Sequence, residues 1–140
     1  MPSISVGERA HRILNHLKSY RTTEEGLSQR LAMEIGELQL QPGESIIGIY
    51  DNRPGSQDER IVVTTVGLHV SLDGKWRSIV YADVERNELP REKLLADTIT
   101  IVLKSGGVLT VPVRGGDEKF RDVFEFVHFL DRVTRKNASE

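Results

Sequence analysis

The chain has 140 residues and a mass of 15.8 kDa, which fits one domain and leaves no room for a large two-domain enzyme. Hydrophobic residues make up 38% of the sequence and charged residues 29%, enough for one apolar core and too apolar for a disordered tail. The net charge of −2 does not indicate a nucleic-acid partner, and the absence of cysteine excludes disulfides and thiolate metal sites.

Apolar runs in the sequence are short. The longest, Ile79 to Ala82, is far below the roughly 20 residues that a membrane-spanning helix needs. The N-terminus also shows no apolar region of a secretory signal. We therefore expect a cytoplasmic domain.

The first 40 residues show helical periodicity, which ends at the turn Gln41-Pro42-Gly43. Thr22 and Glu25 have the spacing of a capping box ahead of a second helix. We expect residues 1–41 to form a helical hairpin that precedes a main domain at 42–136. Its apolar stripes are Val6, Ala10, Ile13, Leu14 and Leu17 in the first helix, and Leu27, Leu31, Ile35 and Leu38 in the second.

From Glu44 onward, β-branched residues broken by Gly, Asp and Asn predict strands joined by tight turns. Asp73-Gly74 and Ser105-Gly106-Gly107 favour antiparallel hairpins, and the polar stretch 51–59 is typical of an exposed loop. Seven strands are expected: Ser45–Tyr50, Arg60–Thr65, Leu68–Leu72, Trp76–Tyr81, Val84–Leu89, Thr98–Lys104 and Val108–Arg114.

A final helix is predicted from Asp117 to about Arg135, after Gly115-Gly116 ends the last strand. Its apolar residues cover roughly 220° of the helix, if each residue advances about 100°. That arc exceeds the ~100° needed to pack on one surface. We expect two apolar neighbours, the strands on one side and the N-terminal hairpin or another protein on the other. One stripe holds Phe120, Val123, Phe124, Val127 and Leu130, and the other Phe126, Phe129 and Val133.

The segment from Arg60 to Leu89 carries a recognisable order of residues: a strand ending at Thr65, the pair Gly67-Leu68, the turn Asp73-Gly74, and the stretch Val80-Tyr81-Ala82-Asp83-Val84. With the element order, this resembles a pleckstrin-homology-like domain, including its bacterial and GRAM branches, over about residues 44–135. The resemblance implies an α+β fold in which a seven-stranded antiparallel sandwich or barrel is capped by the C-terminal helix. It also implies two nearly orthogonal sheets and a role mainly as a binding platform.

Phosphoinositide-binding members of that family carry a basic cluster in the first hairpin, whereas this loop has two cations against three carboxylates. The cations are Arg53 and Arg60, and the carboxylates are Asp51, Asp58 and Glu59. Because the carboxylates offset the cations, high-affinity inositide binding is not expected. Lys75 and Arg77 at the second hairpin would add to a weak anionic-lipid site with Arg53 and Arg60.

The sequence offers no catalytic or metal-ligating motif. His11 and His16 are five residues apart, so they lie on different faces of a helix and cannot chelate together. His69 on a strand and His128 on the last helix do not suggest a catalytic base, and no nucleophile motif is present. No metal and no cofactor are expected.

Trp76 follows the Asp73-Gly74 turn, where it either packs on the edge of the core or stands exposed as a binding anchor. The leading hypothesis is a non-catalytic protein-interaction module, such as a bacterial regulatory or immunity-type protein, that binds another protein or a second copy through an apolar groove or a sheet edge. The alternatives are a peripheral anionic-lipid binder and an enzyme of unrecognised class. The candidate binding residues are Arg53, Arg60, Lys75, Trp76, Arg77, Phe126, Phe129 and Val133.

Overall fold

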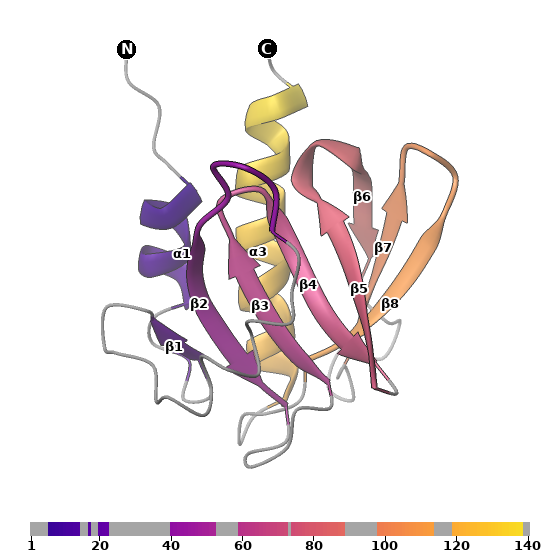
Figure 1. Cartoon of the computed structure of the whole chain (residues 1–140). Coiled ribbons are helices and arrows are strands. Elements are labelled where there is room, and N and C mark those ends of the chain that lie inside the picture. The colour runs from indigo at the N-terminus through magenta and orange to yellow at the C-terminus, as the bar shows by residue number, and fades with distance from the viewer. Residues whose placement is uncertain are drawn as a thin grey trace.

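The computed structural model describes residues 6–14, 17, 20–22, 40–52, 59–72, 74–88, 98–113 and 119–138, and it has an α+β architecture (Figure 1). Two antiparallel sheets are combined with the C-terminal helix α3, Lys119–Ala138. A shorter helix, α1, Val6–Leu14, precedes the strands, and the 3-10 turn η2, Tyr81–Asp83, joins the two sheets.

The seven strands expected from the sequence are all present, with bounds that differ by at most two residues. Their bounds are β2 Ile46–Asp51, β3 Arg60–Thr64, β4 Gly67–Leu72, β5 Lys75–Val80, β6 Val84–Glu88, β7 Thr98–Leu103 and β8 Val108–Pro112. The interior strands β3 and β4 are buried along almost their whole length, whereas β5 and β6 are mostly exposed.

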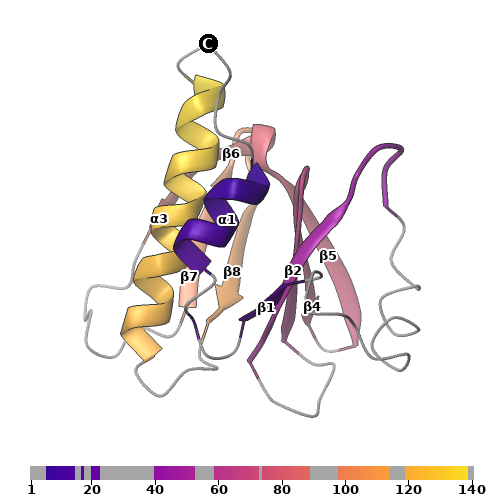
Figure 2. The same ribbon diagram turned by 90° about the vertical axis from the view of Figure 1, so that its left-hand side faces the viewer.

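The strands form two open sheets with consecutive neighbours, in the orders β1-β2-β3-β4-β5 and β6-β7-β8. Among the described strands, no ladder joins one sheet to the other. The expected closed barrel is therefore wrong, since η2 turns the chain from β5 into a separate sheet without pairing β5 to β6. Figure 2 shows the five-stranded sheet on one side of the molecule and α1 and α3 on the other.

Both predicted hairpins are confirmed. Leu72 pairs with Lys75 across the first turn, where Gly74 has a φ of 78°. Val102 pairs with Val108 across the second, where Gly106 has a φ of 102°. Glycine adopts these left-handed conformations without a Cβ clash, which is why both turns close at these positions.

The N-terminal segment differs from the expectation of a purely helical hairpin. Strand β1, Tyr20–Thr22, pairs antiparallel with β2 and adds a fifth strand to the first sheet. Thr22 is therefore the last residue of a strand, and the predicted capping partner Glu25 lies outside the described residues. The predicted second helix, with Leu27, Leu31, Ile35 and Leu38, lies outside the described residues.

Helix α3 packs on two sides, and of its described apolar residues all but Phe124 are buried or partly buried. Phe126 lies edge-on to Tyr50 of β2, with ring centroids 5.1 Å apart, and Phe129 lies edge-on to Tyr81 of η2 at 5.9 Å. The other side of α3 contacts α1. Residues from α1, both sheets and α3 thus share one core, with Ala10, Ile13, Leu14 and Leu17 contributed by the N-terminal segment.

Polar contacts fix how α3 sits on the sheets. The Tyr50 hydroxyl donates to Oδ2 of Asp122 at 2.5 Å, both groups being buried. Nδ2 of Asn87 on β6 donates to Oδ1 of Asp131 at 3.0 Å. These bonds join two positions of the helix that lie about two and a half turns apart to different sheets, so its rotation about its own axis is fixed.

The contribution of α1 to the core can be tested with Leu14→Ala. Leu14 is fully buried, so the truncation should lower the free energy of unfolding by about 3 kcal/mol. Arg12→Ala on the exposed side of the same helix is the control and should change it by less than about 0.5 kcal/mol. Urea denaturation measures both. Equal stability of the two variants would contradict the shared core.

Close approach of β4 and β5 explains the glycine at position 67. A Cβ on Gly67 would overlap the carbonyl oxygen of Ile79, which is backbone and cannot rotate away. Gly67→Ala should therefore destabilise the protein by about 2 kcal/mol through overpacking. Gly107→Ala, whose Cβ would only reach ordinary contact with Leu103, is the matched control. Thermal unfolding of the two variants compares them, and an unchanged melting temperature for Gly67→Ala would show that the sheet can shift.

Candidate functional site

The face of the five-stranded sheet that points away from α3, here called the outer face, carries its own small cluster. Ile49, Val62, His69 and Ser78 lie in one row across β2 to β5, because each pairs with the next in the ladders. Ile49 and Val62 are fully buried, and the half-buried Trp76 packs against them. The outer face thus joins a small apolar patch to a polar group at the β5 end of the row.

A tight turn before β2 places Glu44 over this row. The Gln41-Pro42-Gly43 turn predicted from the sequence is confirmed, with a φ of 82° at Gly43 and the Glu44 amide donating to the Gln41 carbonyl at 3.0 Å. The backbone amide of Gln41 in turn donates to Oε1 of Glu44 at 2.9 Å. The turn therefore fixes both the backbone and the carboxylate of Glu44.

Glu44, His69 and Ser78 form a continuous hydrogen-bonded chain. Oε2 of Glu44 lies 2.8 Å from Nε2 of His69, and Nδ1 of His69 lies 2.6 Å from Oγ of Ser78. The side chains of Glu44 and His69 are only 2% and 8% exposed, whereas Ser78 is exposed. A buried carboxylate and imidazole thus support a hydroxyl that solvent can reach.

Thr64 connects this chain to the turn between β3 and β4. Its hydroxyl donates to Oε2 of Glu44 at 2.5 Å and accepts from the amides of Val66 and Gly67 at 3.1 and 3.0 Å. The Tyr81 hydroxyl donates to the Thr64 carbonyl at 2.8 Å. The Glu44 carboxylate is therefore held from three directions, by the Gln41 amide, the Thr64 hydroxyl and the His69 ring.

These donors control the charge of Glu44. Burial by itself would raise the pKa of the carboxyl group, but the hydrogen bonds from Thr64, Gln41 and His69 outweigh it and lower the pKa below 4.5. Glu44 is therefore an anion at neutral pH that accepts hydrogen bonds on both oxygens.

Strand β5 forms an open edge of the first sheet. Alternate residues of an antiparallel strand direct their backbone N–H and C=O groups to the same neighbour. The Tyr81 amide donates to Val66 on the β4 side, so Arg77 and Ile79 also face β4. The backbone groups of Trp76, Ser78 and Val80 therefore point away from the sheet, where no other described strand pairs with β5.

The candidate residues from the sequence fall into three places. Lys75, Trp76 and Arg77 lie together on β5, the two cations exposed. Arg60 is buried, and its Nε donates to Oδ1 of Asp51 at 2.7 Å with the two side chains 6% and 7% exposed. Arg53 lies outside the described residues. Of the described cations of the lipid-binding hypothesis, Lys75 and Arg77 are thus exposed together, whereas Arg60 is buried in an ion pair with Asp51.

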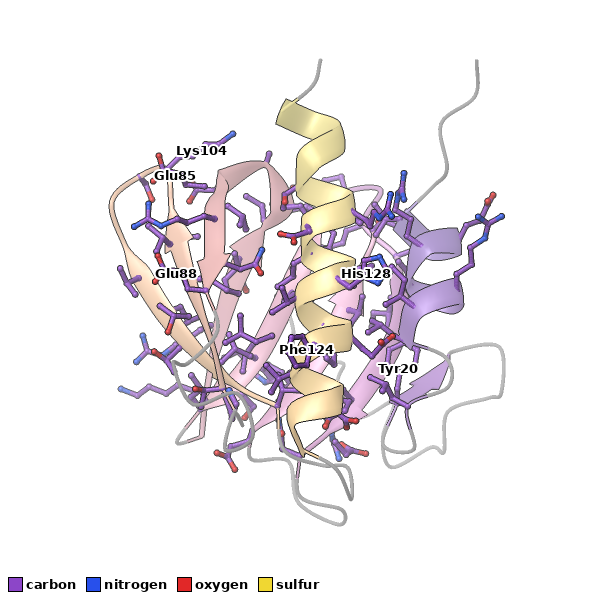
Figure 3. The ribbon with its side chains drawn as sticks, turned by 180° about the vertical axis from the view of Figure 1, so that it is seen from behind. Tyr20, Glu85, Glu88, Lys104, Phe124 and His128 are labelled. Atoms are coloured by element: carbon purple, nitrogen blue, oxygen red, sulfur yellow. The ribbon has the colours of Figure 1, made fainter. Side chains whose placement is uncertain are left out.

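Phe126, Phe129 and Val133 are 1%, 0% and 3% exposed. They lie in the core between α3, the sheets and α1, so they present no open surface to a partner. The second apolar neighbour of α3 is α1, which removes the reason for assigning these side chains to a binding site. On the back of the molecule, Phe124 is the half-exposed aromatic residue that α3 presents (Figure 3).

No group of three metal-ligating side chains occurs within the described ranges. Nor is any helix there long and apolar enough to cross a membrane. No protein-family model matches the chain, and no curated protein is significantly similar to it.

The contacts of His69 were not foreseen from the sequence, although part of the signal was present. The two-residue turn after Leu72 sets the register of β4 and β5, and counting back from Leu72 and forward from Lys75 places His69 opposite Ser78. Glu44 lies 25 residues before His69, and no local pattern connects the two.

Glu44→Gln should lower the melting temperature at pH 7, where the ionised carboxylate accepts three hydrogen bonds. Bonds to charged groups suggest a loss of about 2 kcal/mol. The pKa of Glu44 is lower in the folded state than in the unfolded state. Ionised Glu44 therefore stabilises the fold at pH values above its unfolded-state pKa, and this stabilisation is lost as the pH falls through the folded-state pKa. The gap between wild type and variant should therefore narrow at pH 3. Thermal scans across pH measure this, and a gap that widens in acid would contradict the assignment.

Proposed function

We propose that the protein is an interaction module that binds an extended, acidic segment of another protein as an added strand along β5. The open edge of β5 carries this proposal, because its outward backbone groups at Trp76, Ser78 and Val80 match what an incoming strand requires. Addition of a peptide strand to an exposed sheet edge is a common mode of recognition. Pleckstrin-homology-like membership is part of the proposal and is supported by the order of seven strands and a helix.

The two faces of β5 define the partner sequence. Trp76 and Ser78 project on the outer face, where Trp76 continues the apolar patch of Ile49 and Val62. Lys75 and Arg77 project on the opposite face and are exposed, and β5 contains no acidic residue. A segment with alternating apolar and acidic side chains would therefore complement the strand on both faces.

Charge favours a different protein over a second copy of this chain. Two β5 edges paired with each other would bring Lys75 and Arg77 of both copies close together, and like charges across a ladder are unfavourable. Cations on an edge strand commonly prevent such self-pairing. The lipid alternative is weaker, because the Arg60–Asp51 ion pair leaves Lys75 and Arg77 as the exposed cations of the described candidate set.

Selection from a displayed library of random ten-residue peptides on the full chain tests the proposal. Enriched peptides should alternate apolar and acidic residues. The double variant Lys75→Glu/Arg77→Glu should weaken their binding by at least about tenfold, since two opposite-charge contacts of about 0.5–1 kcal/mol each become repulsive. Fluorescence anisotropy with synthetic peptides measures the affinity.

Lys104→Glu/Arg132→Glu is the matched control, because it changes the net charge equally at two exposed cations away from β5. Its affinity should stay within about twofold of wild type. Hydrogen exchange should show slower exchange of the Ser78 and Val80 amides in the complex, with the inward Arg77 amide already protected. Absence of enriched peptides, or equal weakening by both variants, would overturn strand addition. A third outcome would favour the lipid alternative: no peptide is enriched, the wild type binds phosphatidylserine vesicles, and Lys75→Glu/Arg77→Glu abolishes that binding while the control variant keeps it.

A further inference from the structure

The hydrogen-bonded chain on the outer face has the arrangement of an activated hydroxyl nucleophile. We propose that Ser78 attacks acyl esters, with His69 as its general base and Glu44 as the residue that positions the imidazole. Such groups are recognised by geometry and role, with the nucleophile within hydrogen-bond distance of the base and the base oriented by a third group. Ser78, His69 and Glu44 meet both conditions, at 2.6 and 2.8 Å. This inference departs from the expectation of a non-catalytic module.

The direction of the hydrogen bonds follows from the charge of Glu44. An ionised carboxylate can only accept, so Nε2 of His69 carries the proton and donates it to Oε2 of Glu44. In the neutral ring, Nδ1 of His69 then holds a lone pair that accepts a hydrogen bond from the Ser78 hydroxyl. This is the tautomer that a general base needs, and the His69 side chain is only 8% exposed, so the surrounding protein restricts the motion of the ring.

Position on the edge strand makes Ser78 reachable. The residue is exposed, and its backbone amide is one of those that point away from β4. In serine hydrolases the nucleophile's own amide helps to bind the oxyanion that forms during attack. Ser78 of β5 thus supplies both the hydroxyl and one oxyanion donor, and His69 of the neighbouring strand β4 supplies the base.

The reaction balances with water as the second reactant. The Ser78 Oγ lone pair forms a bond to the acyl carbon while the hydroxyl proton passes to Nδ1 of His69. The ester C–O bond then breaks, and the leaving alcohol takes that proton. Water attacks the acyl-serine in the same way, gives a proton to Nδ1 and releases the carboxylic acid as Ser78 regains its proton. Glu44 offsets the positive charge on the ring during each transfer.

A second exposed serine provides the control. Oγ of Ser105 donates to Oδ2 of Asp83 at 3.1 Å, so it contacts a carboxylate without an imidazole between them. Ser78 therefore has a neighbouring imidazole, the group that the proposal requires, and Ser105 contacts a carboxylate instead.

Thiol substitution measures the activation directly, because the natural chain contains no cysteine. The Ser78→Cys thiol beside His69 should react with iodoacetamide at pH 7 at least about tenfold faster than the Ser105→Cys thiol, since a neighbouring imidazole favours the thiolate. Adding His69→Gln should remove the advantage. Adding Glu44→Gln should raise the pH at which the alkylation rate of the Ser78→Cys thiol is half-maximal. A loss of stability alone would not change this pH. Circular dichroism confirms that each variant is folded.

Labelling of the natural chain completes the test. A fluorophosphonate probe should modify wild type at Ser78, located by peptide mass spectrometry, and should leave Ser78→Ala and His69→Gln unmodified while Ser105→Ala is labelled as wild type. Equal alkylation rates for the two thiols, or no label on Ser78, would overturn the proposal. Neither assay uses a peptide partner, so failure here leaves strand addition standing, and failure of strand addition leaves this result unaffected.

Discussion

The apolar arc of α3 is the constraint on which the rest of the fold depends. An arc of roughly 220° cannot be covered by one flat neighbour, since packing on one surface uses only about 100°. The two sheets cover one side through Tyr50 and Tyr81, and α1 covers the other. Because α1 completes this packing, its residues Ala10, Ile13 and Leu14 are part of the domain core.

The two faces of the first sheet have different surroundings. Its inner face packs on α3, whereas the outer face has no helix from the described residues packed on it (Figures 1 and 2). Side chains there need partners of their own, and the polar ones find them in the chain through Glu44, His69 and Ser78. The outer face thus carries the hydrogen-bonded chain of Glu44, His69 and Ser78, of which only Ser78 is exposed.

Charge pairing decides which cations remain available. Arg60 is buried beside Asp51, and a buried pair of this kind loses much if either partner is drawn away. Lys75 and Arg77 of β5 are exposed to solvent, so a partner can contact them. The proposed binding site therefore uses Lys75 and Arg77 of β5, and the buried Arg60 is not part of it.

The sequence by itself determined the seven strands after residue 44, the hairpins and the final helix, because turns such as Pro42-Gly43 and Asp73-Gly74 and the periodicity between them are local properties. It also contained the His69–Ser78 pairing, which follows from a two-residue turn. It did not predict β1, whose strand character depends on pairing with β2. Only the tertiary structure decided that α1 covers α3, that Asp51 occupies Arg60, and that Glu44 reaches His69. Those outcomes depend on which distant segments contact one another in the fold, and a local sequence pattern does not predict contacts between residues that are far apart in the chain.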